Sequence, residues 1–193
     1  MGSAVLLTSE PWSSTPRLCV MVTRKPQRRR GPQRAAETTR KVVLPRCVLE
    51  WSGVKSARGE IDKRLTQRAI DAALQRDDLR GHALCVMLVD DAECVRLHGE
   101  HFGDPTPTDV MSFPDGSRDP ETGLIRLGDL AVCLDVARRV ATKRKRPVAE
   151  EMSLYVLHGC LHLLGYDDIK AADRKEMWTI QREVMKELGV TIG

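Results

Sequence analysis

The segment from Pro147 to Gly165 constrains the fold more than any other part of this 193-residue chain. Proline suits the first turn of a helix and glycine suits the position just after a helix ends, so the two residues bracket one helix. Apolar side chains occupy most of the circumference of that helix, at Met152, Tyr155, Val156, Leu157, Leu161 and Leu164. Because such a helix must be buried nearly all round, we expect it at the centre of the molecule.

Two histidines on this helix, His158 and His162, are four residues apart. That spacing places them on one face with Cβ atoms roughly 5 to 6 Å apart, so one Zn²⁺ with Zn–N bonds of about 2.0 to 2.1 Å can bind both. Gly165 can adopt the left-handed conformation that reverses the chain after a helix. The reversal would carry Asp167 and Asp168 back towards the histidines and supply a carboxylate as third ligand.

The alternative is that the histidine pair binds no metal, because histidines on helices commonly pack or hydrogen-bond without one. The glycine stop followed at once by two carboxylates favours the metal site. Zinc peptidases with the motif H-E-x-x-H use the glutamate as general base. Here Gly159 stands in its place, so the peptidase interpretation lacks its base. A glycine does permit another element, or a substrate backbone, to approach the helix closely.

The residues from His158 to Asp167 match every fixed position of the string H-G-x-L-H-L-x-G-Y-D. In this string the chain resembles the bacterial YbeY-type endoribonucleases, also called rRNA maturation factors. Leu97 and the segments 107–114 and 127–130 are similar to further motifs of that family, in the same order and at similar spacing. The resemblance covers the chain from about residue 46 to the C-terminus.

The resemblance implies a metal-dependent phosphodiester hydrolase, specifically a zinc-dependent endoribonuclease specific for single strands. It implies a role in maturation of the 3′ end of 16S rRNA and in ribosome quality control, with RNA and the small ribosomal subunit as partners in the cytoplasm. One Zn²⁺ per chain, bound by His158, His162 and Asp168, would keep a position open for the water that attacks. Asp167 would orient a ligand histidine by accepting its second ring N–H; its alternative role is to cap the turn.

Two positions depart from the family pattern. Asp168 stands where most relatives have a third histidine, although two histidines and a carboxylate are a normal catalytic zinc set. Phe102 stands where some relatives have an arginine thought to hold the phosphate. The alternatives are therefore a ribosome-assembly factor that binds RNA or protein and holds a structural metal, and a metallohydrolase of another bond.

The loop from 103 to 114 contains three prolines and precedes a short strand. We expect it to form one wall of the active-site groove. Thr108, Asp109 and Ser112 would then offer hydrogen-bonding groups to a sugar-phosphate backbone. The alternative is that these side chains brace the turn, as Asp and Thr beside proline commonly do.

Two further clusters have a possible function and an ordinary alternative. His98 and His101 are three residues apart and would be reserve metal ligands if Asp168 turned outward; surface histidines are the alternative. The run from Lys143 to Arg146 could contact RNA, but it also places cations where the dipole of a helix end favours them.

Hydrophobic periodicity predicts nine elements. The strands are expected at 42–51, 83–89, 110–113 and 124–134, the last interrupted at Gly128–Asp129, and the helices at 60–74, 91–97, 135–145, 147–164 and 171–188. This order predicts an α+β fold, in which helices pack on a small mixed β-sheet and the central helix carries the metal.

The charge is divided unevenly along the chain. Residues 1–46 hold ten Lys or Arg against two Glu, a balance of +8, which leaves −4 for the rest of the total of +4. We expect residues 1–45 to be a disordered basic extension and 46–193 to be the nuclease domain. A cationic arm would bind RNA phosphates without sequence preference. An extension with no role and an organelle transit peptide are the alternatives.

The six cysteines are scattered and include no C-x-x-C pair. They are typical of reduced cysteines in a cytosolic protein, whereas a disulfide framework is the alternative. No run of about 18 apolar residues occurs, so no membrane span is expected.

Overall fold

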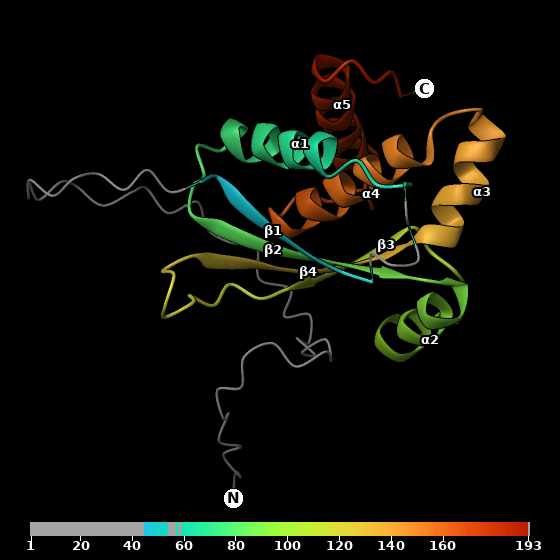
Figure 1. The fold of residues 1–193 in the computed structure, drawn as a ribbon, viewed down its shortest axis with the longest axis horizontal. Helices are drawn as coiled ribbons and strands as arrows, with labels where there is room; N and C mark the ends of the chain where they lie inside the picture. Colours follow the sequence, from blue (N-terminus) through green and yellow to red (C-terminus); the bar gives the residue numbers. More distant parts are fainter. Residues whose placement is uncertain (1–44, 54–56, 58, 193) are drawn as a thin grey trace, which may run out of the picture.

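The structure is a computed structural model that describes residues 45–53, 57 and 59–192. Within these ranges five helices and four strands follow one another in the predicted order (Figure 1). They are β1 (Cys47–Ser52), α1 (Lys63–Arg76), β2 (His82–Val89), α2 (Asp91–Phe102), β3 (Val110–Pro114), β4 (Ile125–Cys133), α3 (Leu134–Arg144), α4 (Val148–Leu163) and α5 (Ala171–Glu187). The predicted basic extension, Cys19 and the start of the first predicted strand lie in residues 1–44, outside these ranges.

The four strands form one mixed sheet in the order β1-β2-β4-β3. β1 pairs with β2 and β2 with β4 in parallel, while β3 pairs with β4 antiparallel and lies at the edge. Helices α1, α4 and α5 lie on one side of the sheet and α2 on the other (Figure 1). The predicted α+β fold with a small mixed sheet is confirmed.

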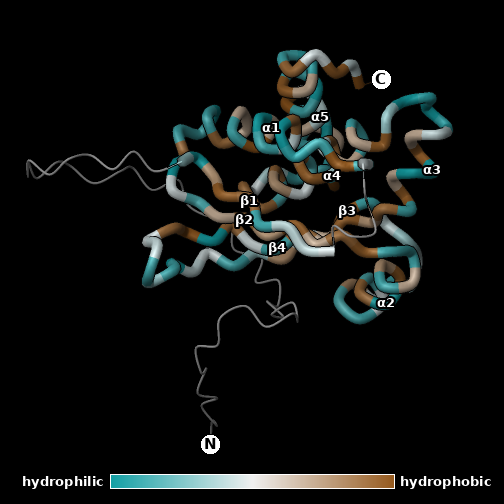
Figure 2. Tube along the Cα trace, in the orientation of Figure 1, coloured by the Kyte–Doolittle hydropathy of each residue, from teal (hydrophilic) through white to brown (hydrophobic). Residues whose placement is uncertain are grey.

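Helix α4 is the centre of the core, as its apolar circumference predicts. Its side chains Val156 and Cys160 pack in one cluster with Leu84 and Leu130 of the sheet. Leu157 belongs to a second cluster, which contains residues of α1 and α5. In Figure 2 the hydrophobic segments of α4 and the strands face one another between the layers. Burial on two sides fixes the direction in which the remaining face of α4 presents its polar side chains.

Gly159 lets α4 approach the sheet. A Cβ atom built at this position would lie 2.8 Å from Leu130 Cδ2 and 2.9 Å from Val110 Cγ2. It would also lie 3.1 Å from Ser112 Oγ. The elements that approach α4 closely at this glycine are therefore strands β3 and β4. Their packing leaves no room for the glutamate that a zinc peptidase would carry at this position.

Helix α2 is longer than predicted. It was expected to end at Leu97 but continues to Phe102, and it ends at Gly103, whose φ is 73°. The rings of His98 and Phe102, one turn apart, are 5.5 Å from centroid to centroid. This contact stabilises the last turn of α2.

The predicted interruption of the fourth strand is a shift in pairing and not a break. β4 is continuous from Ile125 to Cys133, and its register against β2 shifts between Ala83 and Leu84. Gly128 has a φ of 148°, and a Cβ atom there would lie 2.2 Å from the carbonyl oxygen of Phe113. The glycine therefore permits the close pairing with β3.

The cationic run after α3 is partly engaged in ion pairs. Arg144 Nη1 lies 3.2 Å from both carboxylate oxygens of Glu151, and Arg146 Nη1 lies 3.6 Å from Glu151 Oε1. The Glu151 side chain is fully buried. These arginines therefore neutralise a buried carboxylate at the start of α4.

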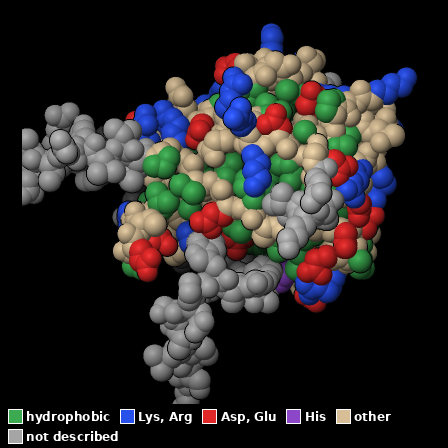
Figure 3. All heavy atoms as spheres, in the orientation of Figure 1, with side chains coloured by type: hydrophobic (Ala, Val, Ile, Leu, Met, Phe, Trp, Pro, Cys, Tyr) green, Lys and Arg blue, Asp and Glu red, His purple; other side chains and the backbone are tan. Residues whose placement is uncertain are grey.

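Acidic and basic side chains are mixed over the α2 and α3 end of the face shown in Figure 3. Two ion pairs contribute there, Arg139 with Asp91 and Arg138 with Asp135. In the part of the chain that the structure describes, no helix has the length and apolar character needed to cross a membrane.

Candidate metal centre

The C-terminal end of α4 carries the predicted metal ligands on a well-defined helix stop. The N–H of Tyr166 donates to the carbonyl of Leu161 and that of Gly165 to the carbonyl of His162, each at 3.0 Å. Gly165 has a φ of 91°. This pair of hydrogen bonds with a left-handed glycine is the Schellman motif. The chain reverses here, as Gly165 predicts, and runs back along the helix end.

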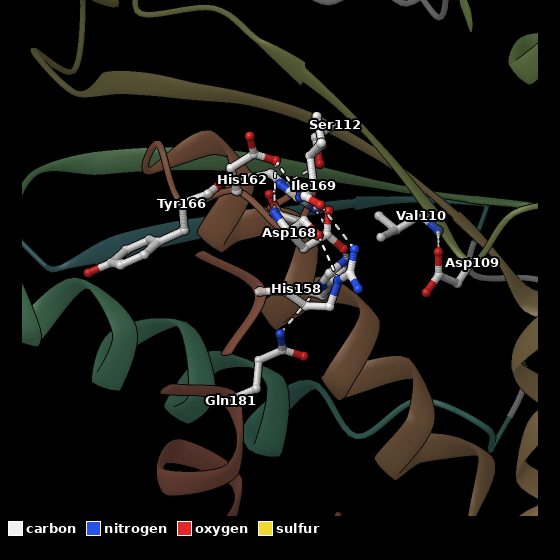
Figure 4. Close-up of polar contacts among 12 residues, drawn as sticks. Asp109, Val110, Ser112, His158, His162, Tyr166, Asp168, Ile169 and Gln181 are labelled. Carbon is white, nitrogen blue, oxygen red and sulfur yellow. Dashed lines mark hydrogen bonds and ion pairs between the residues drawn. The ribbon is translucent and has the colours of Figure 1, made fainter. Parts of the chain in front are cut away.

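The reversal brings three polar side chains together (Figure 4). The Nε2 atoms of His158 and His162 are 3.2 Å apart. Asp168 Oδ2 lies 3.8 Å from Nε2 of His158, and Asp168 Oδ1 lies 4.0 Å from Nε2 of His162. One potential ligand atom from each residue falls within 4.8 Å of the others, the one such group of three among the described residues.

These distances fit one metal ion. Two nitrogens bound to a tetrahedral zinc at about 2.05 Å would be roughly 3.3 Å apart, close to the separation of the two Nε2 atoms. The carboxylate oxygens are slightly farther away and belong to a rotatable side chain. The donor set of two imidazoles and one carboxylate is that of catalytic zinc centres with one open position.

The other ring nitrogens have partners of their own. His162 Nδ1 lies 3.1 Å from the carbonyl oxygen of Tyr166, and His158 Nδ1 lies 3.2 Å from the amide of Gln181 on α5. These contacts at Nδ1 orient the two rings, and both Nε2 atoms point towards Asp168 (Figure 4).

The centre is partly accessible to solvent. The exposed side-chain fractions are 21% for His158, 29% for His162 and 43% for Asp168. Burial lowers the pKa of His158, and His162 lowers it further, while Asp109 and Asp168 act in the opposite direction. A neutral imidazole is the form that can bind a metal, so these surroundings favour metal binding.

The segment that carries Asp168 is held at two points. Asp167 Oδ1 accepts the backbone N–H groups of Asp168, at 2.7 Å, and of Ile169, at 3.1 Å. Arg174 on α5 donates from Nε to the carbonyl of Asp168 at 2.8 Å and from Nη2 to that of Ile169 at 3.0 Å. For Asp167 these bonds correspond to the turn-capping role. The contacts of the two Nδ1 atoms described above come from Tyr166 and Gln181 instead.

All three predicted substrate-binding residues make hydrogen bonds within the protein. Ser112 Oγ donates to the carbonyl of Gly159 at 3.2 Å, which joins the edge strand β3 to α4. Asp109 Oδ1 accepts the N–H of Val110 at 2.9 Å and the hydroxyl of Thr108 at 3.2 Å. Asp109 is also near enough to affect the pKa of His158. The start of β3 therefore lies next to the predicted ligands.

The reserve ligands lie elsewhere. His98 and His101 are on α2, on the side of the sheet away from α4 (Figure 1). His98 Nδ1 lies 2.8 Å from the carbonyl oxygen of Thr106, and the ring of His101 stands edge-on to Phe113 with centroids 5.2 Å apart. Neither histidine belongs to the three-residue group around Asp168.

Sequence reasoning missed two residues of this site, Gln181 and Arg174. Both are on α5, which follows the ligands in the chain, and both reach back to them. The apolar period of α5 predicted the helix, but the period alone does not say which polar side chain would face the histidines. Gln181 is a polar residue within the buried face of α5, and that misplaced polarity is the signal that could have found it.

A half-buried helix end presents two histidines beside a loop carboxylate, which places the chain in the class of α+β proteins whose donor set is that of hydrolytic metal centres. The family model described as Endoribonuclease YbeY matches residues 54–189. The chain belongs to this family of endoribonucleases, a family of metal-dependent phosphodiester hydrolases. The resemblance in the sequence is thereby confirmed.

Individual relatives agree with this assignment. A protein named endoribonuclease YbeY from Clavibacter michiganensis subsp. michiganensis is 36% identical over 134 residues, which are 65% of this chain and 86% of the relative. That of Clavibacter sepedonicus is 37% identical over the same shares. That of Kineococcus radiotolerans is 40% identical over 127 residues, 61% of this chain and 72% of the relative.

A solved structure is also similar, the solution structure of TM1509 from Thermotoga maritima. The sequence identity is 22% and the TM-score is 0.45, with 74% of this chain and 92% of that chain covered.

Proposed function

We propose that this protein is a zinc-dependent endoribonuclease that cuts single-stranded RNA. The observation that carries the proposal is the convergence of His158, His162 and Asp168 at the end of α4. Bound there, Zn²⁺ would supply an activated water and polarise a phosphoryl oxygen. One ion per chain is expected, since no second group of three metal-binding side chains occurs in the described ranges.

The chain's own residues would have distinct roles in this activity. His158, His162 and Asp168 hold the ion. The carbonyl of Tyr166 keeps His162 oriented by accepting the Nδ1 hydrogen. The turn held by Asp167 keeps the Asp168 carboxylate at the helix end.

The position of the start of β3 beside the predicted ligands supports a role in binding RNA. Thr108, Asp109 and Ser112 would meet the sugar-phosphate backbone there, with hydroxyl and backbone groups as donors. Single strands are the expected substrate, because an unpaired backbone can enter a groove beside a partly buried metal, whereas an A-form duplex presents a shallow outer surface.

We further propose that the activity serves maturation of the 3′ end of 16S rRNA and ribosome quality control, with the small ribosomal subunit as partner; membership of the family supports this proposal. We expect the protein to act in the cytoplasm, which agrees with the five described cysteines, all unpaired. The basic residues 1–45 would add sequence-independent affinity for RNA phosphates.

One observation favours a second candidate, a ribosome-assembly factor whose metal is structural. Phe102, at the position of the phosphate-holding arginine of some relatives, has an exposed apolar ring that packs on His98. It offers no charge to a phosphate. A peptidase is disfavoured, because Gly159 packs against the sheet and cannot be replaced by a base.

The test is cleavage of a fluorescent single-stranded RNA by zinc-loaded protein, with the same RNA in a duplex and casein as comparison substrates. We expect cleavage of the single strand only, and loss of cleavage in His158→Ala at unchanged folding. Binding of RNA without cleavage by the zinc-loaded protein would support the assembly factor. Cleavage that survives His158→Ala would reject the proposed centre.

A further inference from the structure

We propose that Gln181 is a positioning residue for the metal centre: its side-chain amide fixes which nitrogen of His158 faces the metal. This inference rests on the metal centre of the proposed function and assigns a role to a residue of α5 that is not itself a ligand.

The first observation is where Gln181 lies. It is 94% buried, with 6% of its surface exposed, on a helix whose other buried residues are apolar. Its amide Nε2 is 3.2 Å from Nδ1 of His158, across 23 positions of sequence. Burying an amide without a hydrogen-bond partner is unfavourable. His158 provides that partner.

The second observation is the order of hydrogen bonds through both rings. A carbonyl oxygen only accepts, so the Tyr166 carbonyl requires the hydrogen of His162 to be on Nδ1. His162 Nε2 is then an acceptor, and His158 Nε2 lies 3.2 Å from it. With the nitrogen of Gln181 towards His158 Nδ1, the amide donates to Nδ1 and the hydrogen of His158 is on Nε2. The chain of donors runs from Gln181 through both rings to Tyr166.

When zinc binds both Nε2 atoms, the ring hydrogen of His158 can no longer be on Nε2. His158 must then carry its hydrogen on Nδ1, and Nδ1 needs an acceptor. A glutamine has a donor at one side of its amide and an acceptor at the other. A half-turn about the last side-chain bond brings Oε1 to Nδ1, with no movement of α5. Gln181 can therefore serve both tautomers of His158, and the carbonyl of Tyr166 serves only one tautomer of His162.

Three variants test this role, with zinc affinity as the readout, measured by competition with a chromophoric chelator. Gln181→Met keeps the length of the side chain and removes both donor and acceptor. We expect a 10- to 100-fold weaker affinity, the usual effect of losing such a partner. Gln181→Glu keeps only acceptors, so it should bind zinc at least as tightly as the unaltered protein. Gln67→Met makes the same change on α1, where the amide contacts Cys47 and Asp71, and should leave the affinity unchanged.

Nitrogen-15 NMR of the imidazoles adds a readout that packing alone would not move. In the zinc-loaded unaltered protein the hydrogen of His158 should be on Nδ1, and thermal unfolding should show all three variants folded. Unchanged zinc affinity in Gln181→Met would overturn the proposal. So would an equal loss in Gln181→Met and Gln181→Glu, since packing would then explain both, or an NMR spectrum with the hydrogen of His158 on Nε2.

These assays measure zinc binding and not RNA cleavage. A zinc-loaded protein that cuts no RNA would therefore refute the nuclease while leaving the role of Gln181 intact.

Discussion

The molecule contains two pairs of histidines, one on each side of its sheet, and the surroundings of the two pairs differ. His158 and His162 on α4 are one turn apart, with their Nε2 atoms 3.2 Å from each other. His98 and His101 on α2 are separated by three residues and have separate partners, a carbonyl and an aromatic ring. In both pairs a glycine follows the first histidine. What distinguishes a metal site here is the surroundings of the rings.

Three surroundings matter, and among the described residues only the α4 pair has all three together. A left-handed glycine turns the chain back after the second histidine, a carboxylate arrives on the returning segment, and a polar partner lies beside Nδ1 of each ring. At the α2 pair the chain also turns at a left-handed glycine, Gly103. There it continues as a proline-rich loop and brings no carboxylate to a shared point with the rings.

The largest difference between the pairs should appear on removing one ring from each. His158→Ala removes a ligand, so we expect zinc affinity to fall more than the 10- to 100-fold typical of an outer partner. His98→Ala should leave zinc affinity unchanged. Isothermal titration with zinc at fixed pH measures both. Equal losses in the two variants would remove the distinction between the pairs.

The carboxylate is the next test. Asp168→Ala should weaken zinc binding by more than the 10- to 100-fold typical of an outer partner, because the ion keeps two ligands but loses the only anionic one. Asp168→His would supply an imidazole as third ligand, and should bind zinc more tightly than Asp168→Ala. Metal content after dialysis, measured by mass spectrometry, separates the two variants. Full retention of zinc by Asp168→Ala would show that another group supplies the third ligand.

Gly159 and Gly99, which follow the first histidine of each pair, should change the stability of the protein in opposite directions when replaced by alanine. A methyl group at Gly159 would press on Leu130 and Val110 in the core. Overpacking of about 1 to 3 kcal/mol outweighs the better helix propensity of alanine, about 1 kcal/mol. We expect Gly159→Ala to be destabilised by roughly 1 to 2 kcal/mol.

At Gly99 the added methyl would meet only Pro105, at 3.4 Å, an ordinary contact. Gly99→Ala should therefore be neutral or stabilised by up to about 1 kcal/mol. Urea unfolding of both variants gives the comparison. A stabilised Gly159→Ala would mean that α4 does not depend on close approach to the sheet.

The smallest effect is expected where a side chain holds the ligand loop from outside. Arg174→Ala removes two hydrogen bonds to the carbonyls of Asp168 and Ile169. Each is worth about 0.5 to 1.5 kcal/mol and the site is exposed, so zinc affinity should fall by only a few-fold. Lys175→Ala, the next residue on the same helix, is the control. A loss as large as that of Asp168→Ala would make Arg174 essential to the ligand geometry.

The sequence predicts those parts of the structure that depend on local geometry. The course of α4, the stop at Gly165 and the return of Asp168 all follow from residues within one stretch of about twenty. The order of strands and helices follows from periodicity, because each element is either amphipathic or wholly apolar.

The parts that could not be predicted depend on contacts between distant segments. Gln181 faces His158 only because α5 packs against α4, and its place in the buried face of α5 does not by itself say which residue of another helix it contacts. Similarly, the hydroxyl of Ser112 had two candidate partners, RNA or the protein, and only the packing of β3 on α4 places the Gly159 carbonyl within 3.2 Å of it. The extra turn of α2 continues to the left-handed Gly103, and it carries a ring contact between His98 and Phe102 that a pattern of polarity does not encode.

If one zinc ion at His158, His162 and Asp168 cuts single-stranded RNA, the rate of cleavage must follow the amount of bound zinc. Protein stripped with a chelator would be reloaded stepwise, with zinc content and RNA cleavage measured on each sample. We expect a rate that rises in proportion to zinc and levels off at one ion per chain. Cleavage at full rate by zinc-free protein, or no cleavage at one zinc per chain, would show that this ion does not carry the activity.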